Sequence, residues 1–314
     1  MYFPYLRGRR TELLALRDFL KMEDAKRKEV WPVIEPVKED LTSLCRVAKE
    51  MIDNGQKFIL VLNPYQGDFS GSKKDILPLL DVDIREAVGK AWIPSYVYLE
   101  GLNFFTTDSF QEKSVLVFPE NVEFTDVVKG LVYKNSLIGI LDGTENNQRL
   151  SRIVRSIGQN QKLVARLSNN FNEQRRNVDY LGKEDEFFSD DFLDYEQNGY
   201  QGVADYTTLP KSYTEGGMLP YAVAIHLTYR SDESIRIHHF VSDSNLDQSG
   251  IQTKFAEAAE KVKAFFSQRP KTQGVRMLLN YLETDRYPGL AALKRCAILN
   301  HIEIMMEAQH RESA

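Results

Sequence analysis

The sequence predicts an α/β fold, a TIM-type (β/α)8 barrel, on three observations. Eight short apolar runs recur along the chain. Most of the stretches between them have helix spacing, which is typical of parallel strands joined by crossover helices. Most runs also end on a polar or charged residue, and the carboxyl ends of barrel strands converge on one mouth. The runs span residues 33–36, 58–63, 95–100, 114–120, 137–142, 163–169, 202–206 and 222–226.

Both ends of the chain add elements to a plain barrel. Residues 3–7 (FPYLR) are compatible with a ninth strand, which would place one of the eight runs outside the barrel. The alternating segments on either side of the polar turn SDES at 231–234 predict a terminal β-hairpin. We expect a barrel-like domain over 1–250 and a C-terminal helical region over 251–314. Helix spacing predicts helices over 11–24, 40–53, 73–89, 123–133, 146–158, 252–268 and 274–308.

One connection is unusually long and acidic. Residues 170–200 carry several aromatic residues and many carboxylates. A loop of this length in a compact domain is a surface excursion, a lid or a partner surface. Because the segment follows the sixth run, we expect it to lie over the barrel mouth.

Composition limits the classes of partner and compartment. A net charge of −5 argues against a whole-protein field that gathers nucleic acid, so we expect such contact only through a partner or through the local basic clusters at 7–10 and 173–176. No run reaches the roughly 18–20 apolar residues of a membrane span. Cys45 and Cys296 lie in helical patterns and are predicted to be reduced core residues, which favours a cytoplasmic protein.

The polar ends of the strands are the candidate site. In most runs the terminal residue continues an apolar stripe by strand alternation, as Asn63 does with Ile59 and Val61. If that stripe fills the barrel, its last residue reaches the mouth. The candidate catalytic residues are Glu35, Asp142, Arg166, Asp205 and His226. The candidate ligand-binding residues at further strand ends are Asn63, Glu100 and Asn169, and Glu120 ends the fourth run.

Three interpretations fit this set. Carboxylate, amide and imidazole ligands suit Mg²⁺ or Mn²⁺, with Glu35, Asp142 and Asp205 as the expected metal ligands. Such a metal would activate water against a phosphoester while Arg166 holds the phosphate. The same residues could form a metal-free pocket with one raised-pKa carboxyl, or pair with one another and leave no site. The sequence has no P-loop, GxSxG, HExxH or paired CxxC motif.

Three segments carry a family resemblance. YFPYLRGRRTELLALRDF at 2–19, WPVIEPV at 31–37 and HFVSD at 239–243 resemble the bacterial and phage "beta protein" family. The resemblance covers the first 40 residues well and the rest mainly by strand order. It implies a barrel-like α/β fold and a neighbourhood linked to mobile elements and phage defence, and it brings no established catalytic residues. Arg7, Glu12 and Glu35 match its motif positions, and Arg7 joins the ligand-binding residues on this ground alone.

These observations favour a binding or regulatory subunit over an enzyme. The barrel would recognise a ligand or partner at its polar mouth and act with a partner protein, such as a nuclease encoded nearby. Acidic charge and the lack of catalytic motifs favour this hypothesis. The alternative is a metal-dependent phosphoesterase or nuclease that uses the carboxylate cluster, and a weaker one is a metal-free lyase or isomerase.

Overall fold

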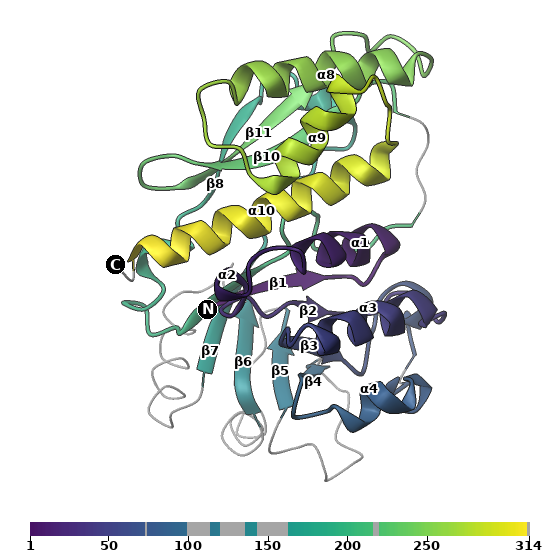
Figure 1. Cartoon of the computed structure of the whole chain (residues 1–314), viewed down its shortest axis with the longest axis vertical. Coiled ribbons are helices and arrows are strands. Elements are labelled where there is room, and N and C mark those ends of the chain that lie inside the picture. The colour runs from purple at the N-terminus through teal and green to yellow at the C-terminus, as the bar shows by residue number, and fades with distance from the viewer. Residues whose placement is uncertain (73, 99–113, 120–135, 143–162, 216–219, 313–314) are drawn as a thin grey trace. The chain divides into compact units, whose positions relative to one another are not determined.

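The structure is a computed structural model in which the chain forms two compact units (Figure 1). It describes all residues except 73, 99–113, 120–135, 143–162, 216–219 and 313–314. The first unit comprises 1–13, 20–169 and 191–206, and the second comprises 14–19, 170–190 and 207–314. The second unit therefore begins well before residue 251, where we had expected the C-terminal region to begin.

The first unit is a closed barrel of eight parallel strands, as predicted (Figure 1). Neighbouring strands pair in order, and β9 pairs with β1 to close the ring. The barrel strands are β1 (Tyr2–Leu6), β2 (Val33–Ile34), β3 (Phe58–Val61), β4 (Trp92–Val97), β5 (Ser114–Phe118), β6 (Ser136–Asp142), β7 (Leu163–Ser168) and β9 (Gly202–Asp205).

Short helices connect the described strands. In α3, residues spaced as on one helical face are buried, among them Leu44, Ala48 and Met51. The helix expected over 73–89 is shorter, because a 3-10 turn containing Pro78 precedes it. The elements are α1 (Arg10–Phe19), α2 (Asp24–Arg27), α3 (Thr42–Asp53), η1 (Gly67–Phe69), η2 (Leu77–Leu79), α4 (Val82–Glu86) and α7 (Asp191–Asp194). The helices expected over 123–133 and 146–158 lie outside the described residues.

The N-terminal segment is a barrel strand, so the run at 222–226 lies outside the barrel. All five residues of β1 are buried, which is the pattern of a parallel strand covered on both faces. The run at 222–226 leads instead into β10 (Ala224–Arg230) of a hairpin. An alternating segment with only one apolar face suits an antiparallel sheet better than a barrel wall.

Alternate side chains along each strand fill the barrel. The inner cluster includes Phe3 and Tyr5 of β1, Val33 of β2 and Ala204 of β9. Its other buried members are Ile59, Val61, Val97, Val115, Val117, Ile138, Ile140, Ala165, Leu167 and Tyr206. These residues define which strand positions face inward.

The second unit is an antiparallel sheet packed against helices. Its strand order is β10, β11 (Ile235–Val241), β8 (Asp185–Ser189), so the predicted hairpin is confirmed and the acidic segment supplies the third strand. The helices are α8 (Ile251–Phe265), α9 (Gln273–Glu283) and α10 (Leu290–Glu312), and the turn η4 (Asn177–Tyr180) precedes β8. Apolar residues of the hairpin, such as Ile225 and Phe240, share one core with all three helices.

We expect Gly202→Ala to destabilise the barrel at its closing seam. A Cβ atom at Gly202 would lie 2.7 Å from the Phe3 ring and 2.8 Å from the Met1 carbonyl oxygen. Overpacking of this kind costs about 1–3 kcal/mol. Urea unfolding followed by circular dichroism would measure the loss. Gly139→Ala in β6 is the matched control, because no described atom lies within 4 Å of its Cβ position, and an equal loss in both variants would contradict the assigned packing.

Candidate functional site

Four side chains form a polar cluster at the carboxyl ends of three adjacent strands. Arg7 follows β1, Glu35 follows β2 and Tyr206 follows β9, while Tyr5 lies inside β1. Glu35 is fully buried, forms an ion pair with Arg7 and accepts a hydrogen bond from the Tyr5 hydroxyl at 2.9 Å. The Tyr65 backbone N–H donates to its other oxygen at 3.4 Å. The barrel therefore gathers a carboxylate, a guanidinium and phenol groups at its mouth.

Aromatic rings enclose the Arg7 guanidinium. Its central carbon lies 4.9 Å from the centroid of the Tyr5 ring and 5.0 Å from that of Tyr206. The two rings meet edge to face at 5.2 Å. Contacts of a cation with ring faces are attractive and gain strength away from water. Because Arg7 is only 4% exposed, the rings and Glu35 together take the place of its hydration.

Two backbone features hold Arg7 in this position. The Arg7 backbone N–H donates to the side chain of Glu12 in the first turn of α1, where acceptors for free N–H groups are needed. Gly8 follows with a φ of 64°, which favours glycine, and its Cβ position lies 3.4 Å from the Glu35 carbonyl oxygen. Arg7 therefore contacts both Glu12, through its backbone, and Glu35, through its side chain.

Two carboxyl groups of this region, those of Glu35 and Glu12, have raised pKa values. Burial raises the pKa of Glu35 above its ordinary value, although Arg7 and the Tyr5 hydroxyl oppose that rise. Burial also opposes the charged form of Arg7, yet Glu35 and the tyrosines raise the pKa of Arg7 overall. Burial raises the pKa of Glu12 to about 7, against the opposing effects of Arg9 and Arg7. A carboxyl with a raised pKa is suited to exchanging a proton near neutral pH.

The predicted asparagines have simpler surroundings. Asn63 lies at the end of β3, where its side chain donates to the Val97 carbonyl oxygen at 2.9 Å and accepts from the Val97 N–H at 2.8 Å. The Asn63 side chain thus continues the hydrogen bonding between β3 and β4 beyond the end of β3. Asn169 follows β7 and is exposed.

Arg166 and Asp205 point away from the barrel interior, so their predicted place inside the mouth is wrong. In β7 the inner residues are Ala165 and Leu167, and Arg166 pairs outside with Asp191 at 3.0 Å. In β9 the inner residues are Ala204 and Tyr206. Asp205 instead accepts a hydrogen bond from the Tyr2 hydroxyl at 2.8 Å. The apolar stripes that carried the prediction pack on the outer face, because parallel strands are buried on both sides.

His226 belongs to β10 in the second unit and not to a barrel strand. Its predicted place at the mouth is therefore also wrong, for the reason that moved its run out of the barrel. The side chains of Asp142, Glu100 and Glu120 lie outside the described residues.

The described residues do not form the metal site that the sequence suggested. Of the three expected metal ligands, only Glu35 is described at the mouth, because Asp205 faces outward and the Asp142 side chain is not described. Among the residues that the structure describes, no three His, Cys, Asp or Glu side chains are placed to hold a metal ion.

Sequence reasoning missed the tyrosines. Tyr206 was passed over because Asp205, one residue earlier, was taken as the inward end of β9. The alternation of Phe3 and Tyr5 along β1 was the available signal, since it places both in the barrel once β1 is accepted as a strand.

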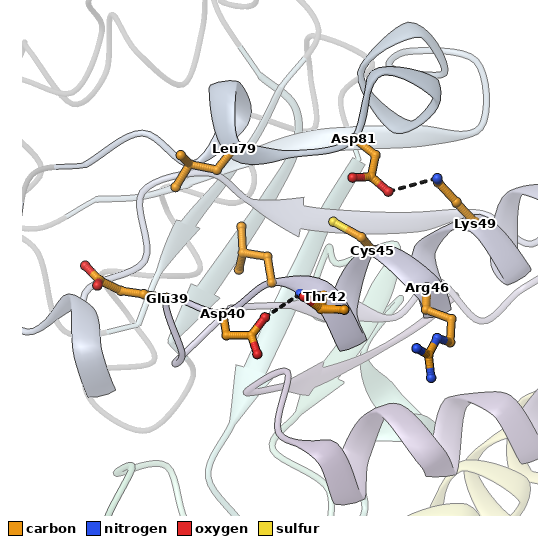
Figure 2. Close-up of a pocket in the computed structure, with 9 residues that line it drawn as sticks. Glu39, Asp40, Thr42, Cys45, Arg46, Lys49, Leu79 and Asp81 are labelled. Atoms are coloured by element: carbon orange, nitrogen blue, oxygen red, sulfur yellow. Dashed lines mark hydrogen bonds and ion pairs between the residues drawn. The ribbon is translucent and has the colours of Figure 1, made fainter.

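A separate surface pocket of about 590 Å³ lies beside α3 and the start of α4 (Figure 2). Leu41, Cys45 and Leu79 supply its apolar lining, and Lys49 pairs with Asp81 at 2.8 Å on its rim. None of the residues predicted for the site lines it. Its remaining lining residues are Glu39, Asp40, Thr42 and Arg46.

Comparison with known proteins adds no relative: no family model, curated protein or solved structure matches this chain. No described helix is both long and apolar enough to cross a membrane. Cys45 and Cys296 are free and buried, as predicted. The fold and site therefore define this protein as a parallel eight-stranded α/β barrel with a polar cluster at the carboxyl end of its strands.

We expect Arg7→Met to destabilise the barrel by about 3–5 kcal/mol, because it leaves a buried carboxylate without its partner. Adding Glu35→Gln should restore part of that loss, since the remaining group is neutral and still accepts from Tyr5. Urea unfolding of the two single variants and the double variant gives the coupling energy. Lys38→Met is the control, because the exposed Lys38–Asp68 pair should be worth less than about 1 kcal/mol. Strict additivity of the Arg7 and Glu35 losses would contradict the pair.

The raised pKa of Glu12 predicts a pH dependence of stability. A carboxyl whose pKa rises on folding contributes stability that is complete at low pH and is lost as pH rises through the folded value, here about 7. Between pH 5 and 8 the wild-type chain should therefore lose about 1–3 kcal/mol more than Glu12→Gln. Unfolding at both pH values measures this difference. Glu23→Gln, at an exposed position, should behave as wild type.

Proposed function

We propose that this protein is a ligand-recognition barrel that binds a small anionic ligand at the Arg7–Glu35 cluster and acts as a subunit beside a partner protein. The observation that carries the proposal is the buried ion pair between two tyrosine rings at the mouth. Barrels of this class place their binding and catalytic residues at the carboxyl ends of the strands.

The energetics of the pair favour a functional role over a stabilising one. Removing two charges from water costs several kcal/mol for each, and replacement of a buried pair by apolar residues is often neutral or stabilising. An apolar layer would have completed the barrel core formed by Phe3, Val33 and Ala204. A charged pair in that place makes sense if a ligand uses it.

Charge exchange gives a mechanism for binding an anion. Glu35 has a raised pKa, so it can accept a proton when a carboxylate or phosphate approaches Arg7. The protonated carboxyl would then give up its pairing, and the anion would take its place on the guanidinium, whose planar donors match such oxygens. Binding would therefore take up about one proton at neutral pH.

The partner and its setting rest on the family resemblance of the first 40 residues. A nuclease partner in a bacterial anti-phage system fits a barrel that recognises a ligand without a described catalytic cluster. The two buried free cysteines favour a reducing, cytoplasmic setting. Nucleic acid would be contacted through the partner or through the basic residues at 7–10 and 173–176.

Calorimetry of the purified chain tests the proposal with succinate and inorganic phosphate as probes. We expect at least one of them to bind with a dissociation constant below about 1 mM, and the observed heat to change between buffers of different ionisation enthalpy in the sense of proton uptake. The double variant Arg7→Met/Glu35→Gln should lose the binding, and Arg10→Met, at an exposed position beside the cluster, should keep it.

Two outcomes would overturn this function. If neither anion gives a heat of binding, the proposal that the cluster binds a small anionic ligand is wrong. Stabilisation of the wild-type chain by Mg²⁺ or Mn²⁺ that disappears in Glu35→Gln would favour the metal-dependent phosphoesterase instead, since a metal bound to the folded state raises its stability by mass action.

A further inference from the structure

A histidine pair joins the two strands of the hairpin in the second unit. His226 of β10 and His239 of β11 lie directly opposite each other in the register. Their Nδ1 atoms are 2.7 Å apart, which is a hydrogen bond between the two rings. His239 is buried and His226 is partly exposed.

The groups that cover this pair come from the acidic segment 170–190. The Tyr180 ring lies 4.6 Å from the His226 ring and 4.3 Å from the His239 ring, and Phe171 meets His226 edge to face at 5.3 Å. Glu186 of β8 lies 3.0 Å from Nε2 of His239. The histidines thus contact three separate points of one segment, whose sequence had suggested a lid or docking element.

The hydrogen bonds fix the tautomer of each ring. An ionised Glu186 only accepts hydrogen bonds, so His239 must carry its hydrogen on Nε2. The Nδ1 of a neutral His239 is then an acceptor, and His226 must donate to it from its own Nδ1–H. Nε2 of His226 is left as the basic nitrogen at the partly exposed end of this chain.

The chain can carry one extra proton but not two. A proton added at Nε2 of His226 leaves the ring-to-ring hydrogen bond intact. A second proton would give both Nδ1 atoms a hydrogen, and two cationic rings would face each other at 2.7 Å. Like charges at this distance repel strongly in a poorly solvated site.

The surroundings oppose protonation of both rings. Burial lowers the pKa of His226 well below its ordinary value, and His239 and Lys294 lower it further. Burial also lowers the pKa of His239, against the opposing effects of Glu186 and Asp185. The charged and titratable groups that face the pair are Glu186 and Asp185 of β8, Tyr180 of η4, His238 of β11 and Lys294 of α10.

We propose that the His226–His239 pair is an acid-sensitive latch that holds segment 170–190 on the hairpin, and that protonation of the pair releases this segment. The sign follows from the lowered basicity of the rings. The two rings bind protons less well in the closed state than in the open state. They therefore favour the closed state fully above about pH 6.5, and this contribution to the free energy of closing is lost as pH falls below that value. The opened segment, which includes β8, takes Tyr180 and Glu186 away from the β10–β11 hairpin.

Nitrogen NMR of the ¹⁵N-histidine-labelled full chain tests the closed state. At pH 7.5 we expect His226 as the Nδ1–H tautomer and His239 as the Nε2–H tautomer. Finding His226 as the Nε2–H tautomer beside an Nε2–H His239 would leave no hydrogen between the two Nδ1 atoms and would overturn the latch.

Hydrogen exchange tests the release. Protection factors correct for the intrinsic pH dependence of exchange. For the amides in 171–190 they should fall at least tenfold from pH 7.5 to pH 5.5. Each proton taken up on opening can shift the opening equilibrium by up to about tenfold per pH unit. His226→Asn keeps a donor near the Nδ1 position and removes one of the two titrating rings, so its fall should be clearly smaller than the fall in wild type. An equal fall in wild type and His226→Asn, or no fall in wild type, would contradict the proposal.

A matched control separates the latch from general loosening of the unit. His301 of α10 is also buried, accepts or donates at 3.1 Å to the Thr228 hydroxyl and contacts Phe188 of β8. His301→Asn should lower protection of 171–190 by the same factor at both pH values, while the tenfold dependence on pH persists. Loss of that dependence in His301→Asn would assign it to packing and overturn the latch.

Discussion

The parallel pairing of β1 with both β2 and β9 is the constraint on which the rest of the barrel depends. Tyr2, Phe3 and Pro4 pair with β9 on one side, and Tyr5 and Leu6 pair with β2 on the other. Without β1, the edges of β2 and β9 would present unpaired backbone groups, which a barrel exists to remove. The N-terminal residues thus decide which of the nine strand-like segments belong to the barrel.

The same strand builds the polar cluster. It places Tyr5 inside the barrel and delivers Arg7 to Glu35 at the end of the neighbouring strand. Glu12 then fixes the backbone at Arg7 from the first turn of the following helix. One βα unit therefore supplies the cation, a phenol and the positioning carboxyl of the cluster.

Because β1 is one of the eight barrel strands, the hairpin segment is not needed in the barrel and forms a second sheet. There the alternation of β10 and β11 buries Ile225 and Phe240 against helices on one face. The opposite face carries His226 and His239, which contact the segment that returns from the barrel. The acidic charge of that segment has a use in this arrangement, because Glu186 orients the histidine pair.

The sequence by itself determined the fold class, the hairpin, the presence of C-terminal helices and the place of Glu35 at the end of a barrel strand. These follow from periodicity, turn chemistry and strand alternation. Only the tertiary structure decided that β1 is a barrel strand and that Arg166 and Asp205 face outward. Parallel strands are apolar on both faces, so periodicity cannot distinguish the inner stripe from the outer one. Which partner meets His226 was equally a matter of strand pairing between distant segments, to which local sequence pattern gives no access.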